Sequence, residues 1–191
     1  MNSSRESQAF RSRPLRLAMA SLAPLVLAFF APVATAAAGD GRFPDLGDCQ
    51  QLRVEAGNKV SAYLFGVGTQ NYQWNGQRWV FIAPEAMLFA DAGYHGLVVL
   101  HFAGPTWQSL SGSQVVGAPI DFCTPDPDSI PWLKLAAVPE FTHGPGLFGG
   151  TTFIQRLNTV GGKAPSVPGV YVGQFVKVPY TANYVFYRES D

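Results

Sequence analysis

The sequence is poor in charged side chains. Asp, Glu, Lys and Arg together make up 14% of its 191 residues, against about a quarter in an ordinary soluble domain. The basic residues are scattered along the chain, so no stripe of Lys and Arg is available to neutralise phosphates, and we expect no nucleic-acid partner. The scattered positions include Arg53, Lys59, Arg78, Lys134, Arg156 and Lys177.

Metal-binding side chains are also scarce, since the chain has three histidines and two cysteines. His95 and His101 fall six residues apart on one expected strand, which separates them by about 20 Å at ~3.3 Å per residue, too far to share a metal without a bend. Neither cysteine has a partner at zinc-finger spacing. The sequence therefore predicts no metal site.

The two cysteines are Cys49 and Cys123. An even count in an exported protein favours a disulfide, which would tie the amino-terminal arm to the middle of the chain. Closing a loop of this length contributes on the order of 4 kcal/mol in the chain-entropy model. Two separate thiols are the alternative, because spacing along the sequence does not establish that the two side chains meet.

The first 38 residues predict a secretory signal peptide. A basic start precedes an almost uncharged run over residues 15–30, and small-x-small cleavage sites end at Ala36 and at Ala38. An uncleaved anchor fits less well, because Pro24 and Pro32 interrupt an apolar run shorter than the ~20 residues of a helical span. We expect an exported protein, periplasmic or extracellular, with no stable membrane span after cleavage. The mildly acidic remainder, residues 39–191, would be a single domain.

What the chain has in abundance is glycine, proline and apolar residues, with 20 Gly, 15 Pro and 47% hydrophobic content. Gly and Pro break long helices, and the short apolar runs between them are typical of strands. We predict an all-β domain, an antiparallel sandwich or a partly open barrel of short strands with long Gly/Pro loops. The expected strands are 59–65, 70–74, 77–82, 86–90, 96–102, 114–120, 132–138, 151–160, 170–178 and 184–188.

The dipeptide Asn75-Gly76 lies between two aromatic-rich runs and predicts a hairpin with a two-residue turn. In that register Tyr72 opposes Trp79, and four aromatic side chains share one face. The face is either a platform that stacks on sugar rings or the core-facing side of the hairpin, and cross-strand aromatic pairs commonly do the second. The four residues are Tyr72, Trp74, Trp79 and Phe81.

The stretch HFAGPTWQSLSGSQVVG, residues 101–117, has the densest mixture of reactive side chains. His101 ends a strand close to Trp107, where it could act as a general base or orient a ligand; the alternative is a hydrogen-bonded structural histidine. Three serines surround the following turn, but none lies in the G-x-S-x-G pattern of a nucleophile elbow. The three are Ser109, Ser111 and Ser113.

Arg156 lies at the centre of a strand that is apolar on both faces. Phe153 and Leu157 flank Gln155 on one face, and Ile154 precedes Arg156 on the other. A polar side chain in the middle of a strand buried on both sides must find hydrogen-bond partners, either in an internal network or at a ligand site. We therefore include Arg156 among the candidate ligand-binding residues.

Several blocks, in order, resemble an uncharacterised family of exported bacterial and fungal proteins, domain of unknown function 3455. The resemblance covers about residues 59–188. The blocks are RWVFIAPEAMLF, HFAGPTW with SGSQVVG, IPWLKLAA, IQRLNTVGGKAP and VPYTANYVFY. The chain departs from the family pattern at Trp74, where a cysteine is expected, and at Ser111, where an aspartate is expected.

Fungal members of this family are often labelled malate dehydrogenase, but this sequence does not support a nicotinamide enzyme. Dinucleotide binding requires a strand, a G-x-G-x-x-G turn and a helix. Here Gly66-Val67-Gly68 is followed by Asn71 at the third glycine position and then by the expected hairpin. We expect neither NAD nor another cofactor.

The ranked hypotheses are the following. The first is an exported, disulfide-tied binding module for a small molecule, glycan or cell-envelope component, with His101, Trp107 and Arg156 at its site. The second is a hydrolase-type enzyme that pairs His101 with an acid from another strand. The third is a purely structural or interaction domain. The sequence favours a binding role over an enzyme.

Overall fold

A computed structural model describes residues 43–190 of the chain. The predicted signal peptide, residues 1–38, and its cleavage sites lie outside the described residues. In the described part, all regular structure is strand apart from two short 3-10 helices, η1 (Gln50–Leu52) and η2 (Pro139–Phe141). No helix among residues 43–190 has the length and apolar character to cross a membrane.

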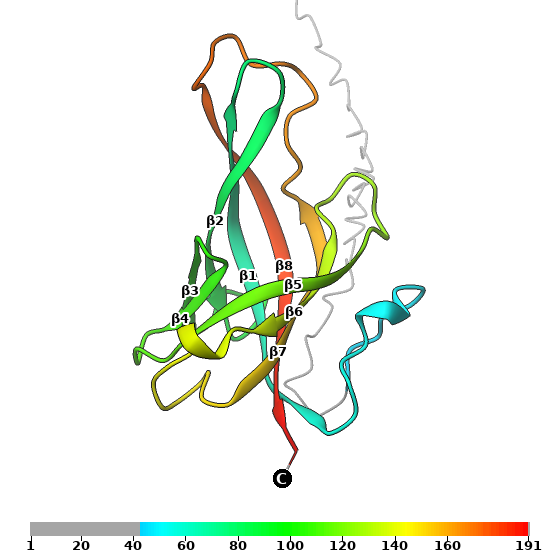
Figure 1. The fold of residues 1–191 in the computed structure, drawn as a ribbon, viewed down its shortest axis with the longest axis vertical. Coiled ribbons are helices and arrows are strands. Elements are labelled where there is room, and N and C mark those ends of the chain that lie inside the picture. Colours follow the sequence, from blue (N-terminus) through cyan, green and yellow to red (C-terminus); the bar gives the residue numbers. More distant parts are fainter. Residues whose placement is uncertain (1–42, 191) are drawn as a thin grey trace, which may run out of the picture. The chain divides into compact units, whose positions relative to one another are not determined.

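The strands form one antiparallel sheet that closes on itself (Figure 1). Each strand pairs with the next in sequence, and the last pairs with the first, so the sheet is a closed barrel. The predicted all-β antiparallel fold is confirmed. In order, the strands are β1 (Asn58–Trp74), β2 (Trp79–Phe89), β3 (Leu97–Phe102), β4 (Thr106–Ser109), β5 (Gln114–Cys123), β6 (Trp132–Ala137), β7 (Thr151–Gly161) and β8 (Phe175–Glu189).

Three long strands replace pairs of shorter ones in the predicted set. β1, β2 and β8 each run through a break that the sequence suggested, because glycine and proline there lie within the sheet. At Gly66 in β1 a Cβ atom would lie only 2.7 Å from the Tyr184 ring. This glycine lets an aromatic ring of β8 pack against the backbone of β1, rather than starting a turn.

The β1–β2 hairpin corrects the predicted register. Trp74 pairs with Trp79, so the loop contains residues 75–78 instead of two residues. The Asn75 side-chain oxygen accepts hydrogen bonds from the backbone N–H groups of Gln77 and Arg78, both at 2.9 Å, and this stabilises the longer loop. Because side chains alternate with a period of two, the two-residue shift leaves the four aromatic residues on one face, as predicted.

The described residues form two apolar clusters, one inside the barrel and one outside it. The inner cluster contains side chains from every strand, among them Trp107, Tyr184 and Phe186. The outer cluster forms where the segment before β1 covers β7 and β8. Its buried residues are Leu46, Cys49, Leu52, Val54, Leu157, Val185 and Tyr187. We call residues 43–57, which cover these strands, the amino-terminal arm.

The arm explains why β7 is apolar on both faces. Gln155 points outward beneath the arm, where its amide nitrogen donates to the Leu52 carbonyl at 2.7 Å. Its side-chain oxygen accepts from the Tyr187 hydroxyl at 2.6 Å. The internal network considered for this strand therefore exists at Gln155, whereas Arg156 faces the interior.

A disulfide between Cys49 and Cys123 ties the arm to the end of β5, and the two Cα atoms are 5.7 Å apart. The predicted pairing is present. It closes a loop whose ends are 74 residues apart in sequence.

Replacing both cysteines by serine should lower the free energy of unfolding by about 4 kcal/mol, because the unfolded chain regains the entropy of an open loop. Urea denaturation of the double variant measures the loss. Reductant should destabilise the unmodified protein to a similar extent and leave the double variant unchanged. Equal midpoints for the two proteins would mean that apolar packing alone holds the arm.

Candidate functional site

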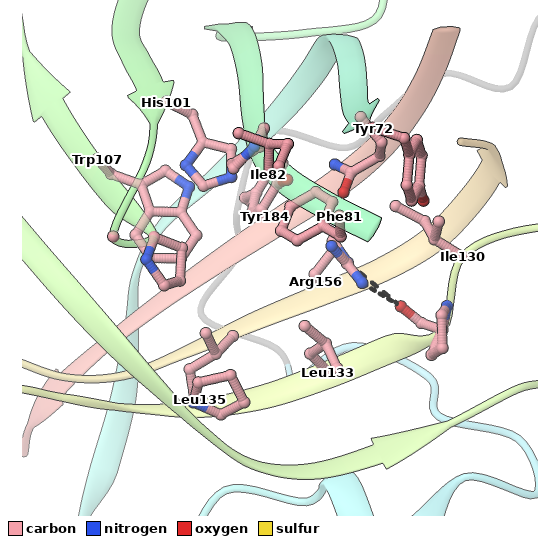
Figure 2. Close-up of a pocket in the computed structure, with 16 residues that line it drawn as sticks. Tyr72, Phe81, Ile82, His101, Trp107, Ile130, Leu133, Leu135, Arg156 and Tyr184 are labelled. Carbon is pink, nitrogen blue, oxygen red and sulfur yellow. Dashed lines mark hydrogen bonds between the residues drawn. The ribbon is translucent and has the colours of Figure 1, made fainter. Parts of the chain in front are cut away.

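The barrel encloses a cavity of about 340 Å³. All eight strands supply at least one lining residue, and most of the lining is aromatic, aliphatic or proline (Figure 2). His101, Trp107 and Arg156 all line this cavity. The other lining residues are Gln70, Tyr72, Phe81, Ile82, Pro84, Gly104, Pro105, Pro119, Ile130, Pro131, Leu133, Leu135 and Tyr184.

His101 and Trp107 are directly opposite each other on β3 and β4. Residues paired in this way present their side chains to the same face of a sheet. Their rings stack with centroids 4.4 Å apart and an interplanar angle of 7°. Tyr184 of β8 meets both rings edge on, at 5.3 Å from His101 and 5.7 Å from Trp107. The three rings form one continuous aromatic wall of the cavity.

His101 is buried and neutral. Its Nδ1 donates to the Thr106 carbonyl oxygen at 2.8 Å, which leaves Nε2 as an acceptor. Burial lowers the pKa of His101 to about 3, and the positive charge of Arg156 lowers it further. The hydrolase hypothesis needs an acid next to this ring. Among residues 43–190 the hydrogen-bond partner of His101 is a backbone carbonyl instead.

Arg156 projects into the cavity from β7, opposite Leu133 of β6 and Tyr184 of β8. Its Nε and Nη2 atoms donate to the Pro131 carbonyl oxygen at 3.2 and 2.8 Å (Figure 2). That oxygen carries no net charge. In the described part of the chain no carboxylate forms an ion pair with Arg156, and none of the lining residues is acidic. The positive charge of Arg156 therefore has no acidic partner at the cavity.

The tyrosines around Arg156 do not supply a negative charge. Burial raises the pKa of Tyr184 well above its usual range, although the charge of Arg156 acts in the opposite direction. The Tyr184 hydroxyl lies 2.8 Å from the Tyr180 hydroxyl, whose pKa burial also raises. Tyr72 donates to the Gly162 carbonyl at 2.7 Å, and burial raises its pKa as well. The cavity therefore carries a single positive charge at neutral pH.

Two buried nitrogen atoms of the lining residues have no hydrogen-bond partner among the described residues. They are the Trp107 indole nitrogen and the Gln70 amide nitrogen. Their side chains are 1% and 3% exposed, so water does not take the place of a partner at the surface. The Gln70 amide lies near enough to Tyr180 to lower the pKa of that tyrosine, but no hydrogen bond of ordinary geometry joins the two.

Sequence reasoning identified three lining residues as site candidates but missed Gln70 and Tyr184. Gln70 opens one expected strand, and Tyr184 opens another. A two-residue alternation counted back from Tyr72 would have placed Gln70 on the same face. No comparable signal pointed to Tyr184, because its contact with Arg156 depends on the pairing of β7 with β8.

The other reactive side chains of the sequence lie away from this chemistry. Ser109 makes hydrogen bonds to Ser111 and Ser113 at 2.9 and 2.8 Å, and Ser113 also accepts from the Phe148 backbone N–H. The serines therefore hold the β4–β5 turn. His95 lies before β3 and contacts Asp91 in an exposed turn. Residues 43–190 contain no group of three or more side chains able to hold a metal ion.

Comparison with known proteins gives one match. Residues 55–188 match the model of a family described as protein of unknown function (DUF3455). This confirms the family resemblance of the sequence blocks. No curated protein and no solved structure matches the chain significantly.

The neutral state of His101 should make stability depend on pH. The unfolded chain takes up a proton at this residue near the ordinary value of 6.5, whereas the folded protein resists it until about pH 3. The unfolded state binds more protons between these limits, so the free energy of unfolding should fall as the pH is lowered through this window.

His101→Asn should make that dependence shallower, because the Asn amide can still donate to Thr106 but does not titrate. Urea unfolding at several pH values below about 6.5 measures the slope. His143→Asn, at an exposed position, is the matched control and should keep the original slope. Equal slopes for both variants and the unmodified protein would contradict a buried, neutral His101.

Proposed function

The chain belongs to this family of unknown function, and we propose that its domain binds a small, largely apolar molecule inside the barrel. The observation that carries the proposal is the cavity of about 340 Å³ with an apolar wall and a few convergent polar groups. Concave sites of this size and composition are the usual form of small-molecule sites. His101, Trp107 and Arg156 are the proposed ligand-binding residues.

Exposed apolar side chains at the cavity support the entry of an apolar molecule from solvent. Phe81 and Ile82 of β2 line the cavity, yet 48% and 50% of their side chains remain exposed. Apolar groups in contact with both water and a cavity are stabilised when an apolar ligand covers them. We therefore assign the mouth of the site to this part of β2.

A glycan on the aromatic hairpin is the less well supported form of the binding hypothesis. Trp74 and Trp79 pack against each other with ring centroids 5.5 Å apart. The Trp79 indole nitrogen donates to the Val167 carbonyl at 2.9 Å, and Gly173 donates to the Trp74 carbonyl at 2.8 Å. Because the segment before β8 engages both tryptophans, they do not form a free stacking platform.

Export is part of the proposal. The disulfide between Cys49 and Cys123 is consistent with an oxidising compartment, where such bonds persist. The predicted signal peptide of residues 1–38 gives the route to it. We propose a periplasmic or extracellular protein whose mature part is the single domain from residue 39 onward.

Binding can be tested with N-phenyl-1-naphthylamine, a neutral apolar dye whose fluorescence rises in apolar surroundings. Leu133 lines the cavity opposite Arg156. Leu133→Trp should fill the space and weaken dye binding by about tenfold or more, equivalent to about 1.4 kcal/mol. Leu133→Met preserves side-chain volume and should bind the dye as the unmodified protein does.

Circular dichroism of both Leu133 variants checks that the fold is retained. Equal dye affinity in the Trp and Met variants would place the dye outside the cavity. Absence of dye binding to the unmodified protein would also count against the proposed function.

Export predicts a specific mature amino terminus. When the full chain is expressed in a bacterium with a periplasm, intact-protein mass spectrometry should find a product that begins after Ala36 or after Ala38. The product should appear outside the cytoplasm with its two cysteines oxidised. A cytoplasmic protein that keeps Met1 would contradict the export proposal.

A further inference from the structure

We infer that the cavity selects apolar molecules that carry a carboxylate, and that Arg156 binds this group. The inference rests on the proposed function, since it names the ligand class of the same site. It begins from the charge of the cavity, because Arg156 is the one cationic residue among those that line it and no lining residue is acidic.

The hydrogen bonds of Arg156 do not neutralise it. Both bonds to Pro131 end on one backbone oxygen, and they use two of the five N–H groups of the guanidinium. A charge removed from water is unfavourable unless an opposite charge accompanies it. A ligand carboxylate would supply that charge and accept two parallel hydrogen bonds from the guanidinium fork.

The neighbours of Arg156 reinforce this selection. His101 lies close enough for the guanidinium charge to lower its pKa, and Tyr184 lies opposite Arg156 on the next strand. Both side chains are neutral at physiological pH, so neither repels an anion nor competes for the guanidinium as a counter-charge. The positive potential of the site is therefore available to the ligand.

The two unpartnered nitrogen atoms point to the same ligand chemistry. The Trp107 indole N–H is a donor only, and the Gln70 amide nitrogen is also a donor. Both are buried in the cavity wall without an acceptor among the described residues. An unsatisfied buried donor is costly, and a ligand with acceptor oxygens relieves the cost. A carboxylate has acceptors and no donors.

The rest of the ligand should be apolar. Figure 2 shows Arg156 among Phe81, Tyr184 and Leu133, so the guanidinium is surrounded by rings and aliphatic carbon. An inorganic anion would contact only the polar groups and leave these surfaces uncovered. An aromatic or aliphatic acid covers them and places its charged group at Arg156.

A matched pair of ligands tests the inference. Naphthalene-2-carboxylate and naphthalene-2-carboxamide have nearly the same shape, and only the first is charged at neutral pH. Isothermal titration calorimetry with the full mature domain should find the carboxylate binding at least about tenfold more tightly than the amide, about 1.4 kcal/mol.

Three variants assign the preference to one residue. Arg156→Gln should reduce carboxylate binding to the level of the amide and leave amide binding within about threefold, which also shows that the cavity is intact. Arg156→Lys keeps the charge without the planar fork and should keep part of the preference. Arg78→Gln removes an exposed arginine from the β1–β2 loop and should keep all of it.

The outcomes separate this inference from the proposed function. If the unmodified protein binds both ligands equally, the cavity binds small molecules but does not select carboxylates. If Arg156→Gln retains the preference, or Arg78→Gln abolishes it, Arg156 is not the anion-binding residue. If neither ligand nor the neutral dye binds, both the inference and the proposed function are wrong.

Discussion

The pairing of β1 with β8 is the constraint on which the rest of the structure depends. The two strands pair from Asn58 with Glu189 to Gln73 with Phe175, with one irregularity near Val60. This seam turns an antiparallel sheet into a ring and gives its inner-facing side chains a common interior. It also brings the Tyr184 ring against Gly66. β8 then presents the same tyrosine to Arg156 of β7. The cavity exists because strands from the two ends of the described chain enclose it.

Local patterns in the sequence predicted much of this structure. Runs of branched and aromatic residues identified the all-β class, and the cysteine count identified the Cys49–Cys123 bond. Alternation placed the hairpin aromatics on one face even though the turn length was wrong. His101, Trp107 and Arg156 stood out because each was a polar or aromatic side chain in an unusual setting, and the structure brings all three to one cavity.

The remainder depended on contacts between distant strands. Gly66 looks like a break in a strand until the Tyr184 ring is placed beside it. The pattern of β7 revealed burial on both faces, but only the position of the arm shows that Gln155 points outward and Arg156 inward. Gln70 was missed for the same reason. Its importance comes from an absent hydrogen-bond partner, and a sequence does not display one.

Ring closure also fixes the order in which this protein can fold. β8 is the last strand of the chain, and its partner β1 is the first, so more than a hundred residues separate positions such as Val67 and Thr181 that must meet. Contacts of such long range are slow to form because the loop between them must first be closed. A chain that emerges amino terminus first has no partner for the β8-facing edge of β1 until its final strand has appeared. Until then that edge is open to pairing with other chains, and the speed of the last step determines how long the nascent protein is exposed to aggregation.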